Sequence, residues 1–137
     1  MAQTRNTQQR QLILDLMTDN FTHPTADEIY TQVRQRDPKI SRGTVYRNLN
    51  LLSEQGVLRR LTMPVGPDHY DWNMTNHYHF LCKRCYKVFD TPIRYKESLN
   101  ETPDEMSGFQ TEWHRLLLVG LCPECLKKAQ AMKKETM

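Results

Sequence analysis

The chain has 137 residues, of which 38% are hydrophobic and 26% charged, and its formal net charge is +3 at pH 7. This length suits one ordinary domain or two small ones, and the composition is typical of globular proteins in water. The longest apolar stretch, residues 116–121, is too short to span a membrane, and the first residues hold no apolar signal core. We therefore expect a cytoplasmic protein with reduced thiols and no membrane partner.

Positive charge is concentrated in the first half of the chain. Residues 1–60 hold nine Lys and Arg against six Asp and Glu, whereas residues 61–137 hold ten of each. This distribution is compatible with a nucleic-acid surface in the first half, although an ordinary solvated surface would look the same.

Three helices are predicted in this half. Apolar residues recur at helical spacing over residues 8–17. A capping box beginning at Thr25 starts a second helix, which we expect to end near residues 37–38. Ser41 can cap a third helix, and Gly56 ends it.

A β-hairpin is predicted after the helices. Residues 58–62 and 69–72 have the pattern of strands, and the turn between them, at residues 64–68, is rich in Pro and Gly. Two helices, a short turn, a third helix and a hairpin follow one another in a winged helix-turn-helix. A small helical bundle with a trailing hairpin is the alternative.

The second half begins after a polar joint at residues 73–76, so we predict a winged-helix DNA-binding domain over 1–73 and a dimerisation domain over 74–137. The fold class is therefore α+β, with a small α/β domain following the winged helix-turn-helix. In this second domain we predict strands over 77–81 and 87–91, a short polar helix between 94 and 106, a long strand over 109–121, and a Lys-rich terminal helix.

All four cysteines lie in two Cys-x-x-Cys pairs, Cys82 with Cys85 and Cys122 with Cys125. Four thiolates from two tight turns can bind one Zn²⁺ tetrahedrally. Two disulfides, a redox dithiol and ordinary cysteines are the alternatives, but nothing indicates an oxidising compartment or a thioredoxin core. The 36 residues between the pairs exceed the spacing of a compact zinc finger, so we predict a structural Zn²⁺ that fixes a chain end to a folded domain.

The third helix carries polar residues opposite its apolar face, among them Tyr46, Arg47 and Asn50. Arg and Asn can make bidentate contacts with purine edges, and Tyr can pack on a thymine methyl group or bond a phosphate. With Ser41 at the start of the helix, these are the predicted DNA-binding residues. A plain solvated face could look similar, but the order of the elements and the flanking arginines favour DNA.

A second metal site is suggested by His77 and His79, which are expected on one face of a strand, whereas the first cysteine pair begins on the opposite face. The histidines and the cysteines should therefore serve different metals. Asp71 and Asp90 lie within reach, and with His23 the set would favour Fe²⁺ or Mn²⁺ over a closed tetrahedral zinc site. Such a histidine pair is also common on solvated surfaces, so the residues alone leave this site open.

Four segments resemble the ferric uptake regulator (Fur) family. They are HPTADEIY at residues 23–30, SRGTVYRNL at 41–49, HYHFLC-x-x-C at 77–85 and the final Cys-x-x-Cys at 122–125. The likeness runs from about Arg5 to Lys128 and is nearest to the peroxide-sensing repressors (PerR). It implies a homodimer that binds double-stranded operator DNA and represses transcription, and it does not imply an enzyme.

The resemblance places five regulatory ligands on His23, Asp71, His77, His79 and Asp90. Asp90 points to the peroxide-sensing branch, because iron-uptake relatives usually have Glu there. The resemblance further implies Fe²⁺ or Mn²⁺ at these ligands, and oxidation of His23 or His77 when Fe²⁺ meets hydrogen peroxide. The damaged site would lose its metal and the repressor would release DNA, which is self-inactivation rather than turnover.

Other functions are weighed against this one. An iron- or manganese-responsive uptake repressor without peroxide chemistry is the nearest alternative. A zinc-uptake sensor is less favoured because no cysteine is spare, and a zinc deaminase would need His-x-Glu where this chain has His-x-His. A zinc-stapled protein-interaction module without a DNA role is the last. Asn76 and Tyr78 stand where iron-uptake members have accessory ligands. His114 matches the remaining partner of that accessory site, and it is interpreted as a strand residue rather than a ligand.

Overall fold

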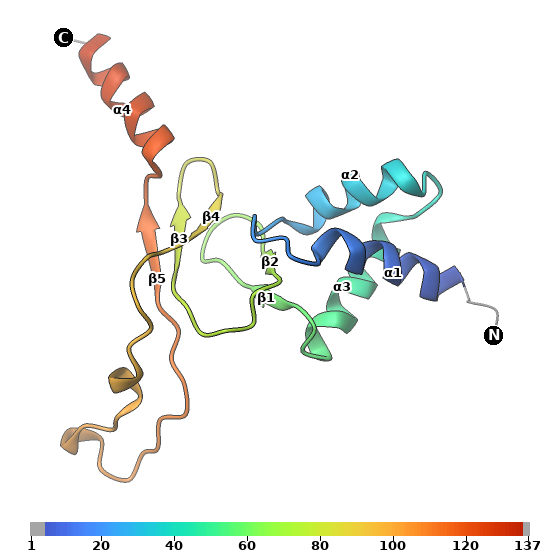
Figure 1. Cartoon of the computed structure of the whole chain (residues 1–137). Coiled ribbons are helices and arrows are strands. Elements are labelled where there is room, and N and C mark those ends of the chain that lie inside the picture. The colour runs from blue at the N-terminus through green and yellow to red at the C-terminus, as the bar shows by residue number, and fades with distance from the viewer. Residues whose placement is uncertain (1–4, 136–137) are drawn as a thin grey trace. The chain divides into compact units, whose positions relative to one another are not determined.

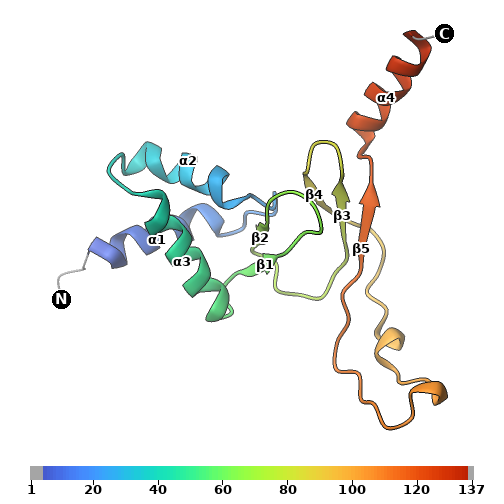
Figure 2. The same cartoon turned by 180° about the vertical axis from the view of Figure 1, so that it is seen from behind.

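The computed structural model describes residues 5–135. The chain divides into two compact units, the first ending at Thr75 and the second beginning at Asn76 (Figure 1). The first unit holds three helices and a two-stranded sheet, and the second holds a three-stranded sheet followed by a terminal helix (Figure 2). No helix within residues 5–135 is long and apolar enough to cross a membrane.

Three helices build the first unit: α1 (Arg5–Met17), α2 (Ala26–Arg36) and α3 (Arg42–Glu54). Their apolar stripes face a common core, which also receives side chains from the loops and the sheet, so burial of this surface stabilises the unit. The predicted three-helix order is confirmed. The buried core residues are Ile13, Met17, Ile29, Val33, Ile40, Val45, Leu49, Leu52, Leu58 and Tyr70.

Local side-chain chemistry sets the helix ends. Thr25 Oγ1 accepts a hydrogen bond from the backbone N–H of Glu28 at 3.2 Å, and Ser41 Oγ accepts one from Thr44 N at 3.1 Å. Each bond satisfies one of the amides that an α-helix leaves unpaired at its start. Gly56, just beyond the end of α3, has a φ of +75°, which glycine adopts without a steric cost.

The hairpin consists of β1 (Arg59–Leu61) and β2 (His69–Asp71), which pair antiparallel with Arg59 opposite Asp71. All three residues of β2 are buried, and His69 also makes an isolated bridge with Thr25 at the start of α2. The winged helix-turn-helix predicted from the order of the elements is therefore confirmed. β2 lies against the N-terminus of α2.

The second unit contains a sheet of β3 (His79–Cys82), β4 (Val88–Asp90) and β5 (Leu117–Gly120), with β3 in the centre. β3 pairs antiparallel with β4 and parallel with β5. A Cβ at Gly120 would lie 3.2 Å from Phe80 Cζ, so glycine leaves room for the Phe80 ring beside β5. The terminal helix, α4 (Pro123–Glu135), is separated from the end of β5 by two residues.

Two sequence predictions for this unit are wrong. The helix expected between residues 94 and 106 is replaced by two short 3₁₀ helices, Glu97–Asn100 and Asp104–Met106, with Pro103 before the second. Of the strand expected over 109–121, only β5 forms. Within residues 5–135, β5 pairs only with the four residues of β3, and strand backbone needs a partner for its N–H and C=O groups.

Candidate metal centres and DNA-contact surface

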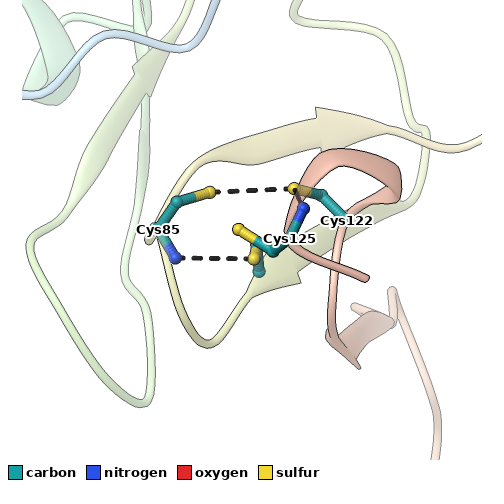
Figure 3. Close-up of side chains that lie close together, drawn as sticks. Cys85, Cys122 and Cys125 are labelled. Carbon is teal, nitrogen blue, oxygen red and sulfur yellow. Dashed lines mark hydrogen bonds between the residues drawn. The ribbon is translucent and has the colours of Figure 1, made fainter. Parts of the chain in front are cut away.

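The four cysteines meet in the second unit. Cys82 ends β3, Cys85 lies in the turn that follows, and Cys122 and Cys125 frame the start of α4. All four thiols are free, and their sulfur atoms lie within 4.8 Å of one another. Figure 3 shows the two turns with their sulfurs directed at each other, Cys85 Sγ and Cys122 Sγ being 3.9 Å apart.

The two turns have the same internal geometry. The backbone N–H of Cys85 donates to Cys82 Sγ at 3.5 Å, and that of Cys125 donates to Cys122 Sγ at 3.5 Å. A backbone donor aimed at sulfur stabilises the thiolate, the form that binds metal. The residue after the first turn, Tyr86, has a φ of +63°, so the chain turns sharply out of the site.

The pKa values of the thiols differ from one cysteine to another. Burial would raise the pKa of Cys82, but backbone N–H groups, those of Cys85 first, lower it to about 6. Burial, together with the neighbouring thiols, raises the pKa of Cys125 to about 12. The Cys82 thiolate thus lies beside the protonated thiol of Cys125, and a divalent cation would replace that proton. The donor set and its closed geometry fit a structural Zn²⁺.

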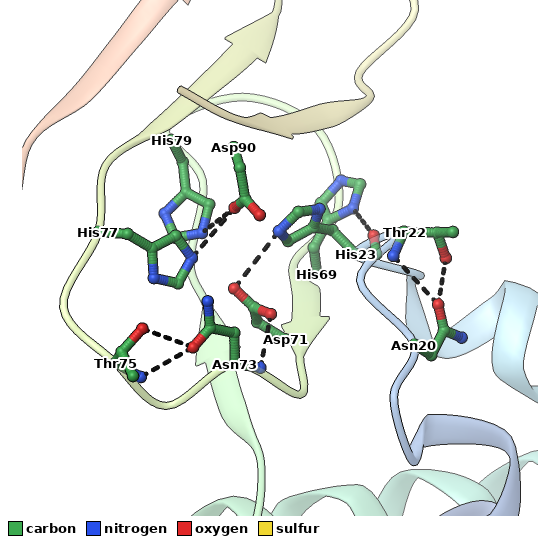
Figure 4. Close-up of polar contacts among 10 residues, drawn as sticks. All are labelled: Asn20, Thr22, His23, His69, Asp71, Asn73, Thr75, His77, His79 and Asp90. Atoms are coloured by element: carbon green, nitrogen blue, oxygen red, sulfur yellow. Dashed lines mark hydrogen bonds and ion pairs between the residues drawn. The ribbon is translucent and has the colours of Figure 1, made fainter. Parts of the chain in front are cut away.

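A histidine and an aspartate face each other inside the first unit. His23 Nε2 lies 3.3 Å from Asp71 Oδ2, and both side chains are almost fully buried (Figure 4). Asp71 also accepts a hydrogen bond through Oδ1 from the backbone N–H of Asn73 at 2.9 Å. A buried carboxylate with an imidazole on one oxygen and a backbone donor on the other is a pre-formed oxygen ligand.

His23 has an unusual backbone conformation. Its φ is +58°, a left-handed value that costs a non-glycine residue about 1–3 kcal/mol. His69, on β2, places its Nδ1 2.6 Å from the carbonyl oxygen of His23. Sequence analysis missed His69; the available signal was its position two residues before Asp71 on a predicted strand, which puts the two on one face.

In the second unit, two histidines converge on one carboxylate. His77 Nε2 lies 3.0 Å and His79 Nε2 3.4 Å from Asp90 Oδ1, and the ring centroids are 4.3 Å apart (Figure 4). His79 stands directly opposite Asp90 in the β3–β4 register. His77 lies before β3 rather than within it, so its predicted place in the strand is wrong, although its side chain still reaches Asp90.

His114 was expected in a strand, but it precedes β5. Its Nδ1 lies 2.6 Å from the side-chain oxygen of Asn100, and its Nε2 lies 2.6 Å from the hydroxyl of Tyr78. Because an amide oxygen only accepts, Nδ1 carries the proton and Nε2 accepts from Tyr78. Both ring nitrogens are therefore used in hydrogen bonds within this unit.

The outer face of α3 presents the polar residues that the sequence singled out. Tyr46, Arg47 and Asn50 are exposed, whereas Val45 and Leu49 are fully buried on the opposite side. This division of the helix is as predicted from its periodicity. Contact of these three residues and of Ser41 with DNA remains a prediction, and the hydroxyl of Ser41 also serves as the helix cap.

Asp27, which the sequence did not single out, holds two side chains of this surface. Its Oδ1 accepts from Arg42 Nη1 at 2.6 Å and from the Tyr46 hydroxyl at 2.5 Å. The bond to Asp27 raises the pKa of Tyr46, so the hydroxyl stays protonated and acts as a donor. In the free protein, a carboxylate thus occupies donors that could otherwise bind phosphate.

A groove of about 230 Å³ separates this helix face from the hairpin. Arg60, from β1, donates to Asp68 Oδ2 through Nε at 3.0 Å and Nη2 at 2.8 Å, and it reaches Asn50 Oδ1 at 3.3 Å. Arg60 therefore links the helix to the hairpin. After Asp27, Asp68 is the second carboxylate on this surface that the sequence analysis did not single out.

Comparisons with known proteins agree with this architecture. Residues 1–119 match the model of the ferric uptake regulator family. The chain is 36% identical over 127 residues to the peroxide-responsive repressor PerR of Staphylococcus aureus strain USA300, covering 93% of this chain and 86% of that protein. The peroxide stress regulator of Campylobacter jejuni has a TM-score of 0.68 at 27% identity, covering 88% of this chain and 91% of that one. The Helicobacter pylori ferric uptake regulator, described with three functional metal-binding sites, shares the fold with a TM-score of 0.77 at 24% identity, covering 89% and 82% of the two chains.

Proposed function

The chain belongs to the ferric uptake regulator family, and on that premise we propose that it is a metal-dependent repressor that senses hydrogen peroxide. Members of this family are transcription regulators rather than enzymes, and they bind operator DNA as dimers. The proposal that hydrogen peroxide is the signal is supported by the ligand chemistry of this chain and by its likeness to the Staphylococcus aureus PerR.

We assign the regulatory metal to His23 and Asp71 of the first unit together with His77, His79 and Asp90 of the second. The observation that carries this proposal is the arrangement inside each unit, where imidazole Nε2 atoms are directed at a carboxylate oxygen at 3.0–3.4 Å. Three imidazoles and two carboxylates suit Fe²⁺ or Mn²⁺. The all-thiolate set in the second unit suits Zn²⁺, so the two sites select different metals.

The regulatory ligands come from both units, and this provides a mechanism for control. One ion held by His23 and Asp71 on one side and by His77 on the other would restrict the orientation of the two units. In a homodimer, that restriction fixes the spacing of the two α3 helices. Only the spacing that matches two operator half-sites binds tightly, so metal shifts the population towards the DNA-binding state.

Peroxide sensing follows from which side chains lie beside the metal. Bound ferrous iron would supply one-electron reduction of hydrogen peroxide, a reaction for which Mn²⁺ is poorly suited. His23 and His77 are the imidazoles that we expect to gain an oxygen atom. An oxidised imidazole is a poorer ligand, so the site would lose its metal and the two units their restraint.

Metal-dependent DNA binding tests the assignment. The protein is stripped of its regulatory metal while zinc is retained, and Mn²⁺ is then titrated against a duplex selected from a random library. We expect Mn²⁺ to promote binding by the natural protein and by His114→Gln, whose imidazole lies outside the ligand set, but not by His77→Ala. Binding that is independent of Mn²⁺, or that still responds to Mn²⁺ in His77→Ala, would contradict the proposal.

A further inference from the structure

His69 is a buried histidine that lies outside the proposed ligand set. It is 3% exposed, and its Nδ1 hydrogen-bonds to the backbone carbonyl of His23 (Figure 4). We propose that His69 is a positioning residue, which holds the ligand His23 in the backbone conformation that presents its imidazole to Asp71. This inference rests on the proposed metal function of His23.

The hydrogen bond fixes the tautomer of His69. Nδ1 lies 2.6 Å from the His23 carbonyl oxygen, and a carbonyl can only accept, so Nδ1 carries the proton. In the neutral imidazole, Nε2 is then the nitrogen without a proton; it is buried and has no hydrogen-bond partner within residues 5–135. Burying an imidazole with one nitrogen unpaired costs free energy. The hydrogen bond to His23 is the polar contact that explains why a histidine stands here.

The backbone of His23 needs such a restraint. Only three non-glycine residues in the described chain have a positive φ: Asp19, His23 and Tyr86. Asp adopts this region comparatively readily, and Tyr86 follows the first cysteine turn. His23 also precedes Pro24, a position that is normally extended. Without a partner for its carbonyl, the peptide after His23 would be held less firmly, and small rotations of it would redirect the imidazole.

The restraint comes from one strand. β2 binds three successive residues before α2: His69 bonds to the His23 carbonyl, Tyr70 N donates to the Pro24 carbonyl at 2.9 Å, and Thr25 bridges to His69. The same strand carries Asp71, whose Oδ2 lies 3.3 Å from His23 Nε2. β2 therefore supplies one ligand directly and orients the other through its backbone.

Two amide substitutions separate positioning from packing. The side-chain nitrogen of His69→Asn can take the place of Nδ1 and keep a donor near the His23 carbonyl, whereas that of His69→Gln corresponds to Nε2. Mn²⁺ dissociation constants are measured on zinc-loaded protein without DNA, and melting temperatures are recorded. We expect His69→Asn to stay close to the natural affinity, and His69→Gln to bind about 10–100-fold more weakly, the usual effect of losing an outer partner of a ligand.

DNA affinity at saturating Mn²⁺ distinguishes a weakened metal site from general damage to the fold, because a damaged fold would bind DNA poorly even with the site full. We expect both variants to reach the natural DNA affinity once Mn²⁺ saturates the site. If folded His69→Gln binds Mn²⁺ as tightly as the natural protein, or if His69→Asn loses as much affinity as His69→Gln, His69 does not position the ligand through Nδ1.

A measurement on the natural, metal-free protein keeps this inference separate from the regulatory site itself. Nitrogen-15 NMR of the imidazoles should place the His69 proton on Nδ1, and a proton on Nε2 would overturn the inference even if the variants fail to fold. By contrast, Mn²⁺ affinity that is unchanged in His77→Ala would overturn the regulatory site and leave the bond between His69 and His23 standing.

Discussion

Arg47 is the side chain on which the proposed reading of bases depends most. It lies on the exposed face of α3. Within residues 5–135, its side chain makes one hydrogen bond, from Nη2 to Thr44 Oγ1 at 3.2 Å. We expect Arg47→Ala to cost about 1–3 kcal/mol of DNA binding and to relax preference at one position of each half-site. Arg94→Ala, which removes the same charge from the second unit, is the control. Equal affinity of Arg47→Ala and natural protein for every duplex in a substitution panel would reject the assigned helix face.

Asp27 should act in the opposite direction. Its carboxylate binds Arg42 and Tyr46 in the free protein, and these donors must leave it before they can reach phosphate. We expect Asp27→Asn to bind DNA more tightly, with a salt dependence steeper by up to about 0.9 in the logarithmic slope, the value for one added phosphate contact. Glu105→Gln, which changes net charge equally in the other unit, is the control. An unchanged slope would show that Arg42 gains no phosphate contact.

Asp90 separates metal binding from peroxide response. Its Oδ1 is the shared neighbour of His77 and His79. Asp90→Glu lengthens this ligand arm by one methylene, so we expect Mn²⁺-dependent DNA binding to persist and the peroxide response of the Fe²⁺ form to fall strongly. Both are measured by DNA binding before and after peroxide treatment. A full peroxide response in Asp90→Glu would show that the length of this arm does not set the sensitivity.

Among secondary-structure elements, the cysteine cluster ties the end of β3 to the start of α4. Zinc held by both turns contributes folding free energy, on the order of 10 kcal/mol in small peptide sites. We expect Cys122→Ser to lose tightly bound zinc, to free α4 for rapid amide exchange and to weaken the dimer. Metal analysis, hydrogen exchange and sedimentation measure these three effects. A reduced natural protein without firmly held zinc would contradict the structural role.

The thiol pKa values predict how zinc binding depends on pH. Burial raises the pKa of Cys85 above its ordinary value and that of Cys125 to about 12, so both thiols are protonated near neutrality in the metal-free protein. Zinc must displace these protons, so its affinity should fall as pH falls, by roughly tenfold per pH unit for each proton released. Calorimetry in buffers of different ionisation enthalpy counts the protons, and zinc binding without proton release would be inconsistent with these pKa values.

The elements also show what the sequence could and could not predict. The caps at Thr25 and Ser41 and the two cysteine turns depend on residues within three positions of each other, so they were predictable. The strand expected over 109–121 was not, because its extent depends on pairing with a distant β3 of only four residues. The role of His69 was not predictable for a related reason. It depends on a positive φ at His23, which no local sequence pattern indicates.

At the scale of the whole molecule, the two kinds of donor set have different roles. The four cysteines are suited to permanent occupancy by Zn²⁺, which would hold the second unit together. The histidines and aspartates of both units are suited to Fe²⁺ or Mn²⁺, and under the proposed function their occupancy links the α3 surface of the first unit to the dimer formed by the second. Peroxide would act on the second set and leave the fold of each unit intact.

Treating Fe²⁺-loaded and Mn²⁺-loaded protein with hydrogen peroxide in parallel tests this account most directly. DNA binding is followed, and peptide mass spectrometry locates any added oxygen. We predict that the Fe²⁺ form gains one oxygen atom at His23 or His77 and releases DNA, whereas the Mn²⁺ form stays unmodified and bound. If the Fe²⁺ form keeps both imidazoles unmodified and remains on its operator, the protein is a metal-uptake repressor without peroxide chemistry.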